Sequence, residues 1–438
     1  MAVEVVARSL SGSAFADELI MEYLRDARLS DRDRGLVLEI VNGTLRWKIQ
    51  LEFLLDLLIA KGLRSNALKL QGILLTGLYQ LRFLDRIPPY ACVSESVDIA
   101  KRLGGKGWGT FVNGVLRNYL RSAQSSPDQK YSDDPDLDLS IRYSHPQWLI
   151  KKWLVEFGPE ATTRLCEFNN DRPPVSLRVV SGRISVSELE KRLTASGFHC
   201  EPSQYFDDFL RLTKSQGLVE TPEYGQGFFA IQDESTALAS LVLAPEPGDT
   251  VLDLCSAPGG KACHIAQLLG NKGEVVAGDI SEKRLQRVLD NARRLQIKNI
   301  STVVLDATNV PTGTKYDKVI VDAPCSGLGV LSRRVDLRWN REPKQIDGLA
   351  VQQQRLLKQA AKCVKAGGTL VYSTCTMETR ENEGVVTAFL EQHSDFELDL
   401  RPIPRFERFR TGDGFWKTLP FRDKIDGMFV ARMVKATN

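Results

Sequence analysis

Two cysteines follow apolar segments of the sequence at the point where each segment ends. Cys325 comes three residues after Asp322, and Cys375 follows Ser373-Thr374. A thiolate that adds to carbon 6 of a pyrimidine makes carbon 5 nucleophilic enough to accept a methyl group, and loss of the carbon 5 proton then expels the thiol. Asp322 could hydrogen-bond to or protonate ring nitrogen 3 and stabilise the adduct. We therefore expect Asp322, Cys325 and Cys375 to catalyse methylation of a pyrimidine at carbon 5.

The other six cysteines carry no such signal. The chain has no CxxC pair and only four histidines, so we expect no metal site and no disulfide framework. An isolated cysteine is usually a small buried residue. We accordingly expect core positions for Cys92, Cys166, Cys200, Cys263 and Cys363, and a packing role for Cys255.

A glycine-rich turn follows an earlier apolar segment and reads Asp253-Leu254-Cys255-Ser256-Ala257-Pro258-Gly259-Gly260-Lys261. Two adjacent glycines let the backbone turn tightly and approach a ligand where the next helix offers unpaired N–H groups. The turn is not a Walker A loop, because Ala262 replaces the required Ser or Thr, and no GxGxxG motif occurs. We expect cofactor contacts from residues 255–261.

Acidic residues close the next two apolar segments. Asp279, 20 residues after Gly259, is placed to accept both hydroxyls of a ribose, and Asp306 is placed for the amino group of an adenine. A ribose-binding acid without a pyrophosphate cradle favours an adenosine ligand that lacks phosphates, of which S-adenosylmethionine is the common one. We add Arg284 and Asp322 to the expected cofactor contacts. The alternative is a generic α/β turn with acids at strand ends.

The elements that would position these residues alternate regularly along the last 200 residues. Apolar strands are predicted at 250–254, 274–278, 301–305, 318–321 and 369–373, with amphipathic helices at 261–269, 281–295, 345–365 and 380–392. This alternation predicts a doubly wound parallel sheet, in which ligands bind at the carboxyl ends of the strands.

Residues 13 to about 122 have helical periodicity, which predicts an all-helical bundle. Its last part carries five cations with no acidic residue among them: Lys101, Arg102, Lys106, Arg117 and Arg121. Trp108, Phe111 and Tyr119 are interleaved with them, so the stretch could bind phosphates and stack bases. The alternative is a solvated helix face whose aromatic residues point into the core.

A second basic stretch lies between the two cysteine segments. It contains Arg333, Arg334, Arg338, Arg341 and Lys344 around Trp339. Beside a nucleic-acid site it would suit an RNA backbone, and the alternative is a charged surface segment. We expect Arg333, Arg334 and Arg338 to contact RNA.

The middle of the chain is mixed. Residues 123–139 are rich in Ser, Pro and Asp and are predicted to be a linker. Beyond them come a helix at 146–157, an extended segment at 175–180, a helix at 186–196 and an apolar run at 209–212. This pattern predicts a small α/β domain of βαβ character.

Length and composition limit the protein class. The 438 residues exceed one average domain, and 58 basic against 55 acidic residues leave a net charge of +3, too even to demonstrate a nucleic-acid partner. No run reaches the roughly 18 apolar residues of a membrane span, and the N-terminus does not resemble a signal peptide. We expect a cytoplasmic monomer that contacts no membrane.

Three segments, Asp253–Lys261, Asp322–Gly327 and Thr374-Cys375, together resemble the RNA cytosine-5 methyltransferases of the Nol/Nop/Sun group, which use S-adenosylmethionine. The match covers most of residues 229–438 and includes Gln232-Asp233, Asp413-Gly414-Phe415 and Gly427-Met428-Phe429. The resemblance implies a Rossmann-like class I methyltransferase domain with a mostly parallel, seven-stranded sheet. It also implies that Cys375 is the nucleophile, that Cys325 aids product release, and that Lys261 lies near the reacting centre. Thr376 departs from the expected Ser but keeps a hydroxyl.

The front of the chain extends the resemblance. Val41–Arg46, Ile87–Ala91 and Phe111–Arg117 are similar to the NusB-type helical domain of the bacterial Sun/Fmu branch of that group, whose substrate is 16S ribosomal RNA. The implied domains are a NusB-like RNA-binding domain at 1–125, a linker at 126–139, a small α/β connecting domain at 140–235 and the methyltransferase domain at 236–438. The implied reaction is methylation of a specific 16S rRNA cytidine at carbon 5.

Several alternatives stay open at this point. The chain could be a non-catalytic RNA-binding or antitermination factor, or it could methylate another RNA. Uracil needs the same thiol addition as cytosine. A methyltransferase for exocyclic amines is disfavoured, because it would carry an Asp/Asn-Pro-Pro-Tyr/Phe loop where this chain has Asp322-Ala323-Pro324-Cys325.

Overall fold

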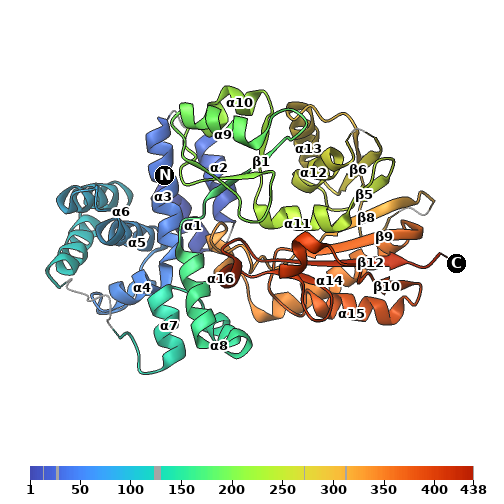
Figure 1. Cartoon of the computed structure of the whole chain (residues 1–438). Helices are drawn as coiled ribbons and strands as arrows, with labels where there is room; N and C mark the ends of the chain where they lie inside the picture. The colour runs from blue at the N-terminus through green and yellow to red at the C-terminus, as the bar shows by residue number, and fades with distance from the viewer. Residues whose placement is uncertain (13, 26–28, 123–129, 271, 311–312, 438) are drawn as a thin grey trace. The chain divides into compact units, whose positions relative to one another are not determined.

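The computed structural model describes residues 1–12, 14–25, 29–122, 130–270, 272–310 and 313–437 (Figure 1). They form two compact units. Unit 1 comprises Met1–Asp171 and Leu331–Asn340, and unit 2 comprises Arg172–Val330 and Arg341–Asn438. Each unit has its own hydrophobic cores. No helix among the described residues combines the length and apolar character that crossing a membrane requires.

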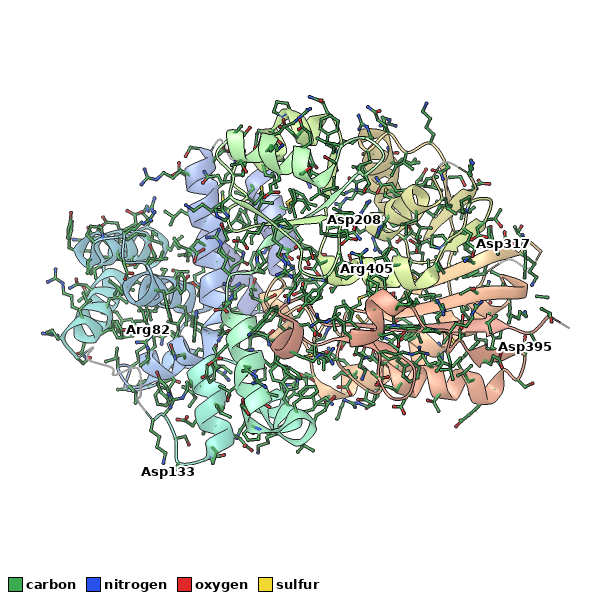
Figure 2. The ribbon with its side chains drawn as sticks, in the orientation of Figure 1. Arg82, Asp133, Asp208, Asp317, Asp395 and Arg405 are labelled. Carbon is green, nitrogen blue, oxygen red and sulfur yellow. The ribbon has the colours of Figure 1, made fainter. Side chains whose placement is uncertain are left out.

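Unit 1 is helical, as predicted. Its helices are α1 (Ala2–Leu10), α2 (Ala16–Arg25), α3 (Asp31–Arg46), α4 (Lys48–Asp56), α5 (Leu68–Phe83), α6 (Pro89–Ser122), α7 (Pro135–Tyr143) and α8 (Gln147–Asn170), with short 3₁₀ turns η1 (Leu63–Ser65) and η3 (Val335–Arg338). Helix α5 is central, with Ile73, Leu74 and Leu78 fully buried. Gly43 lets α3 approach α5, because a Cβ atom there would lie 1.9 Å from Cζ of Tyr79. Arg82 of α5 donates to the hydroxyl of Tyr119 at 3.3 Å (Figure 2).

The predicted linker ends earlier than expected. Residues 123–129 lie outside the described residues, but α7 begins at Pro135, where the Asp134 carboxylate caps the N–H of Asp136 at 3.0 Å. Helices α7 and α8 belong to unit 1, so the predicted domain at 140–235 is divided near Asp171. One hydrogen bond that ties α7 to α4 runs from the N–H of Ile49 to the Ser144 hydroxyl at 2.9 Å.

Arg338 corrects one sequence-based expectation. Its side chain is fully buried in unit 1, where burial lowers its pKa to about 9, so it does not face a nucleic-acid backbone. The guanidinium instead donates to five acceptors, namely the carbonyl oxygens of Arg46, Ser144, Asn169 and Leu331 and the side-chain oxygen of Asn170. These carbonyl oxygens lie at the ends of separate segments, so one side chain joins them.

We expect Arg338→Met to lower the free energy of unfolding by about 3 kcal/mol, because it leaves several buried carbonyl oxygens without a donor. Urea denaturation followed by tryptophan fluorescence measures the change. Arg334→Met is the matched control, since Arg334 is exposed and its ion pair with Asp17 spans 3.9 Å. Its effect should stay within about 1 kcal/mol. Equal effects of the two substitutions would contradict the structural role of Arg338.

Unit 2 contains a small antiparallel sheet. Its strands β1 (Val175–Val179), β2 (Cys200–Pro202), β3 (Phe209–Leu212) and β4 (Phe229–Ile231) are ordered β2-β3-β1-β4, and helix α9 (Val186–Ala195) contributes to the same core. The predicted α/β class is confirmed. The expected βαβ character is confirmed in its split form: β1, α9 and β2 follow one another along the chain, and β3 lies between β1 and β2 and runs antiparallel to both, so β1 and β2 are parallel.

The large sheet of unit 2 has the order β10-β12-β9-β8-β5-β6-β7. Its strands are β5 (Thr250–Asp253), β6 (Glu274–Asp279), β7 (Ile300–Val304), β8 (Tyr316–Asp322), β9 (Val364–Thr374), β10 (Phe396–Leu398), β11 (Trp416–Thr418) and β12 (Met428–Lys435). The five strands from β9 to β7 are parallel, whereas β12 runs antiparallel to β9. The mostly parallel seven-stranded path is confirmed, with β11 pairing β12 as an eighth strand outside it.

Helices cover both faces of this sheet (Figure 1). They are α11 (Glu234–Leu243), α12 (Gly260–Leu268), α13 (Glu282–Arg294), α14 (Pro343–Ala361) and α15 (Glu383–Gln392). The remaining short helices are η2 (Leu218–Glu220), α10 (Pro222–Gly225), η4 (Pro404–Phe409) and α16 (Pro420–Asp423). The four helices predicted at 261–269, 281–295, 345–365 and 380–392 are confirmed as α12 to α15.

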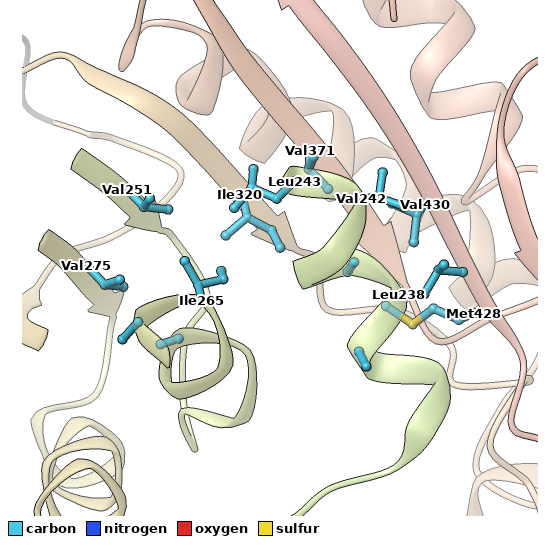
Figure 3. Close-up of a cluster of buried hydrophobic side chains, with 14 of the residues drawn as sticks. Leu238, Val242, Leu243, Val251, Ile265, Val275, Ile320, Val371, Met428 and Val430 are labelled. Carbon is cyan, nitrogen blue, oxygen red and sulfur yellow. The ribbon is translucent and has the colours of Figure 1, made fainter. Parts of the chain in front are cut away.

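Alternate residues of the central strands enter two different cores. Val251, Ile320 and Val371 pack with the residues of α11 and α12 on one face (Figure 3). Leu252, Val319 and Leu370 pack with α14 and α15 on the other. At the amino end of β8, the Asp317 carboxylate accepts the N–H of Thr250 at 2.9 Å and the ammonium of Lys365 at 2.8 Å (Figure 2). These contacts hold the central strands in register.

Candidate active site

The predicted cofactor and catalytic residues lie at or just beyond the carboxyl ends of five parallel strands. The turn 255–261 follows β5, Asp279 ends β6, Asp306 follows β7, Asp322 ends β8 and Cys375 follows β9. In parallel sheets these ends lie on one edge, where the loops can meet around a ligand.

Cys325 and Cys375 lie together. Their sulfur atoms are 3.3 Å apart, a hydrogen-bonding distance for thiols, and both residues are partly exposed. The hydrogen bond with Cys375, followed by burial, raises the pKa of the Cys325 thiol well above its usual value. Cys325 therefore stays protonated at neutral pH and can act as an S–H donor toward Cys375.

Asp322 is held by two donors. It accepts from the Lys261 ammonium at 2.7 Å through one carboxylate oxygen and from the Ser373 hydroxyl at 2.9 Å through the other. Burial lowers the pKa of Lys261, but Asp322 more than offsets this effect, so the net pKa is raised. A permanent cation thus lies beside a carboxylate at the end of β8.

The loops that carry the two cysteines are joined by residues outside the predicted site. Ser326, next to Cys325, hydrogen-bonds to the Thr376 hydroxyl at 2.8 Å and through its N–H to the Glu381 carboxylate at 2.8 Å. Gln353 of α14 donates to Glu381 at 2.9 Å. The Thr376 hydroxyl therefore takes part in the hydrogen bonds between the two loops. Neither Glu381 nor Gln353 stands next to a motif, so sequence reasoning had no signal for them.

The glycine-rich turn is shaped by Gly259. Its φ of 100° lies in the region that favours glycine, and a Cβ atom would lie 2.9 Å from Cγ1 of Val288 in α13. Gly260 begins α12. Arg284 donates to the carbonyl oxygen of Ala257 at 3.2 Å, and Asn291 donates to that of Pro258 at 3.1 Å. Helix α13 thus supports the turn from outside.

The two expected adenosine-binding acids differ in environment. Asp279 is buried, accepts the N–H of Ser281 at 3.0 Å and lies 3.4 Å from the Arg284 guanidinium. Asp306 is exposed, and its carboxylate accepts both the N–H and the hydroxyl of Thr308. Arg284 therefore bridges the turn and Asp279, whereas Asp306 is held only by its own loop in the contacts of the described residues.

Three buried polar atoms at the turn make no hydrogen bond of normal geometry among the described residues. They are both carboxylate oxygens of Asp253 and the hydroxyl of Ser256. Buried polar groups are rarely left unpaired, so their orphaned state fits a polar ligand at this turn. Together with the N-terminus of α12 and the carboxylate of Asp279, these residues fit the adenosine and amino-acid parts of S-adenosylmethionine.

Burial, with a further contribution from Asp322, raises the pKa of Asp253 from its ordinary value of 3.8 to about 7. The folded chain then holds a proton that the unfolded chain releases, so the stability contributed by Asp253 falls as pH rises from about 4 to about 7. Without cofactor, we expect the unfolding free energy of the wild-type protein to fall between pH 5 and pH 8 by up to about 3 kcal/mol more than that of Asp253→Asn, which has no carboxyl group at this position.

Urea denaturation at the two pH values tests this expectation. Asp290→Asn, which changes an exposed carboxylate of α13, should retain the wild-type pH dependence. If Asp253→Asn also kept the wild-type pH dependence of the unfolding free energy, the pKa of Asp253 would not be raised in the folded protein.

The remaining cysteines occupy the expected positions. Cys92, Cys166, Cys200, Cys263 and Cys363 are buried. Cys255 is partly exposed in the turn and packs against the core on the α14 face of the sheet.

The predicted RNA-contacting cations of α6 are exposed in unit 1: Lys101, Arg102, Lys106, Arg117 and Arg121. Of the aromatic residues between them, Tyr119 is buried in the helical core, and Trp108 and Phe111 are partly buried against it. Acidic residues of the preceding turns approach two of the cations, with Lys101 at 3.2 Å from Asp98 and Arg102 at 3.9 Å from Glu95. Phosphate binding by these five exposed cations stays a prediction. In the second basic stretch, Arg334 is exposed and Arg333 is partly exposed.

Three family models match parts of this chain, and together they cover most of it. The family model for the 16S rRNA methyltransferase RsmB/F matches residues 240–434, a NusB family model matches residues 1–121, and an RsmF/B-like ferredoxin-like domain model matches residues 145–218. A probable ribosomal RNA small subunit methyltransferase B of Bacillus subtilis is 37% identical, with 99% of this chain and 98% of the relative covered. The chain belongs to the RsmB/F family of 16S rRNA methyltransferases.

A second relative and two solved structures are also similar to the chain. The ribosomal RNA small subunit methyltransferase B of Escherichia coli is 34% identical, with 93% of this chain and 92% of the relative covered. The crystal structure of PH0851 has a TM-score of 0.82 and 26% identity, covering 98% of this chain and 97% of its own. NSun6 from Pyrococcus horikoshii, solved with the S-adenosylmethionine analogue SFG, has a TM-score of 0.59 and 26% identity, covering 67% of this chain and 99% of its own. This RsmB/F methyltransferase therefore depends on S-adenosylmethionine and has a NusB-like helical domain.

Proposed function

We propose that this 16S rRNA methyltransferase modifies carbon 5 of a specific cytidine, with Cys375 as the nucleophile and Cys325 as the residue that aids release. The observation that carries the proposal is the 3.3 Å separation of the two sulfur atoms beside the Asp322–Lys261 pair. Methylation of an amine or a hydroxyl needs no thiol, whereas carbon 5 of a pyrimidine becomes nucleophilic only after addition at carbon 6.

In the first step, the Cys375 thiolate adds to carbon 6 and the C5=C6 double bond opens toward carbon 5. Asp322 hydrogen-bonds to or protonates ring nitrogen 3 and so stabilises the charge that develops in the ring. Lys261 and Ser373 hold that carboxylate from both of its oxygens. S-adenosylmethionine, when bound, supplies the electrophilic methyl group.

In the release step, a base removes the carbon 5 proton, the C5=C6 double bond re-forms and the C6–S bond breaks. The electron pair of that bond returns to the Cys375 sulfur. Cys325 keeps its proton because its pKa is raised, so its S–H can be donated to the departing thiolate. Loss of this donor would make the adduct persist.

The cofactor and RNA contacts belong to the same proposal. Residues 255–261 approach the cofactor, Asp279 accepts the ribose hydroxyls, and Asp306 accepts from the adenine amino group. Arg284 positions Ala257 and Asp279 for these contacts. The exposed cations of α6, with Arg333 and Arg334, bind the RNA backbone, and Arg338 has no part in it.

We expect Cys375→Ala to abolish methylation while S-adenosylmethionine binding stays within about two-fold of wild type, because the thiol acts on the base rather than on the cofactor. Methyl incorporation into 16S rRNA and calorimetric titration of the cofactor measure the two quantities. Cys363→Ala, at a core position outside the site, is the control and should remain active. Normal methylation by Cys375→Ala would show that Cys375 is not the nucleophile.

We expect Cys325→Ala to accumulate a covalent protein–RNA adduct, because addition and methyl transfer proceed while release slows. The adduct should resist denaturing electrophoresis and be absent from a variant that also carries Cys375→Ala. If Cys325→Ala turned over without a trapped species, release would not depend on this residue.

The target base has its own test. Bisulfite sequencing of 16S rRNA from cells lacking the gene should show a single newly converted cytosine, because 5-methylcytosine resists conversion. An unchanged pattern would argue for uracil or another RNA as the substrate.

A further inference from the structure

Glu381 is a buried carboxylate in the loop between β9 and α15. Its side chain is fully buried and lies six residues after Cys375, outside the groups that would touch the base. Burial raises the pKa of Glu381. An acid in such a position needs a structural reason, because an uncompensated buried charge is strongly unfavourable.

The donors around Glu381 come from the other cysteine loop. The N–H of Ser326 donates to one carboxylate oxygen at 2.8 Å, and the Ser326 hydroxyl donates to the other. Gln353 donates to the first oxygen at 2.9 Å and, from the same nitrogen, to the carbonyl oxygen of Pro324 at 2.9 Å. The carboxylate thus holds the residue that directly follows Cys325.

Further bonds fix the Cys375 side of the same arrangement. The Thr376 hydroxyl contacts the Ser326 hydroxyl at 2.8 Å, and the carbonyl oxygen of Cys375 accepts the N–H of Gly329 at 3.0 Å. The hydroxyl of Tyr372 donates to the backbone oxygen of Glu381 at 2.6 Å, which anchors the acid to β9. Glu381 is therefore attached to the strand that carries one cysteine and bonded to the loop that carries the other.

This placement gives Glu381 control over the sulfur–sulfur distance. Hydrogen bonds to an ionised acceptor are roughly twice as strong as neutral ones, and two of them converge on a single residue. Only one backbone unit separates Ser326 from Cys325, so little flexibility remains between the anchor and the thiol. The Glu381 charge also contributes to the raised pKa of Cys325, after the hydrogen bond to Cys375, burial and the charge of Cys375.

We propose that Glu381 is a positioning residue that holds the Cys325 thiol against the Cys375 sulfur and thereby sets the rate of adduct release. The inference rests on the proposed cysteine mechanism. It assigns to a buried acid, remote from the base and the cofactor, the alignment of the donor that assists the leaving thiolate. Misplacing a reacting group by about 1 Å can slow a step roughly 100-fold, so a modest loop shift is enough.

The first test uses a chemical measure of sulfur proximity that does not require methylation. Diamide oxidises two neighbouring thiols to one disulfide and is itself reduced to a hydrazine. In the wild-type protein, Cys325 and Cys375 should cross-link rapidly, as shown by loss of both thiols to alkylation and mass spectrometry of the linked peptides. Glu381→Ala should slow this cross-link by about 10-fold or more.

The second test measures turnover. Glu381→Ala should accumulate the covalent RNA adduct and release product about 10- to 100-fold more slowly, while S-adenosylmethionine affinity changes by less than about two-fold. Glu381→Gln keeps the shape but removes the charge, so it should restore part of the cross-linking rate and move the alkaline limb of the release-rate profile to lower pH. Ser326→Ala removes the hydroxyl bond but keeps the backbone bond to Glu381, so it should slow both steps less than Glu381→Ala, and the double variant should be no worse than Glu381→Ala.

Glu378→Gln is the matched control. Glu378 is a buried carboxylate of the same loop, and its Oε1 accepts from Arg380 at 3.0 Å rather than from Ser326. It should cross-link and release product like wild type. Circular dichroism and cofactor binding establish that each variant is folded. If Glu381→Ala does not fold, the same measurements on Glu381→Gln test the proposal.

The outcomes separate the two proposals. If Cys325→Ala traps the adduct but the folded Glu381 variants cross-link and release at wild-type rates, the positioning role is wrong and the cysteine mechanism stands. If Cys325→Ala traps nothing while Glu381→Ala slows the diamide cross-link, the geometry holds and the release mechanism is wrong. Equal slowing by Glu378→Gln would reduce Glu381 to a general packing role and overturn the inference.

Discussion

The parallel pairing of β8 with β9 is the constraint on which the site depends. Asp322 pairs with Ser373 in this register, so the loops that leave the two strands start side by side. Cys325 and Cys375 are 50 residues apart in the sequence, and the pairing brings their sulfur atoms to 3.3 Å. A shift of the register by one residue would turn the side chains of β9 to the opposite face of the sheet, because strand side chains alternate. The chemistry is therefore a consequence of strand registration.

The site also concentrates buried charge, and the surrounding hydrogen bonds decide how each charge is tolerated. The carboxylate of Asp322 is offset by Lys261 and that of Glu381 by Ser326 and Gln353, whereas Asp253 has no partner among the described residues and retains its proton to about pH 7. The Asp253 carboxylate at the cofactor turn is left open, whereas the Glu381 carboxylate, which holds the cysteine loops, is hydrogen-bonded through both of its oxygens. This contrast fits a division between a ligand-receiving side of the edge and a rigid, reactive side.

Several sequence-based predictions depended on local signals and held. The apolar segments 250–254 and 369–373 correspond to β5 and to the second half of β9, the glycine turn requires a positive φ at Gly259, and the isolated cysteines are buried. Other predictions failed because charge alone does not show where a side chain points. Arg338 stands among cations in the sequence, yet it is buried as a donor to carbonyl oxygens of unit 1. The helix of Pro135–Tyr143 was missed because its acidic first turn resembles a linker.

The sequence by itself determined the alternation of strands and helices, the glycine-rich turn and the two cysteines for which we propose reactive roles, since each is encoded in neighbouring residues. Only the tertiary structure decided that Glu381 reaches Ser326, that Gln353 reaches Glu381, that Ser373 supports Asp322, and that Arg284 bridges Ala257 and Asp279. Apart from the ion pair between Arg284 and Asp279, these contacts join residues 27 to 55 positions apart. No local pattern encodes such contacts, because they form only when the packed sheet and its helices set the distances between separate loops.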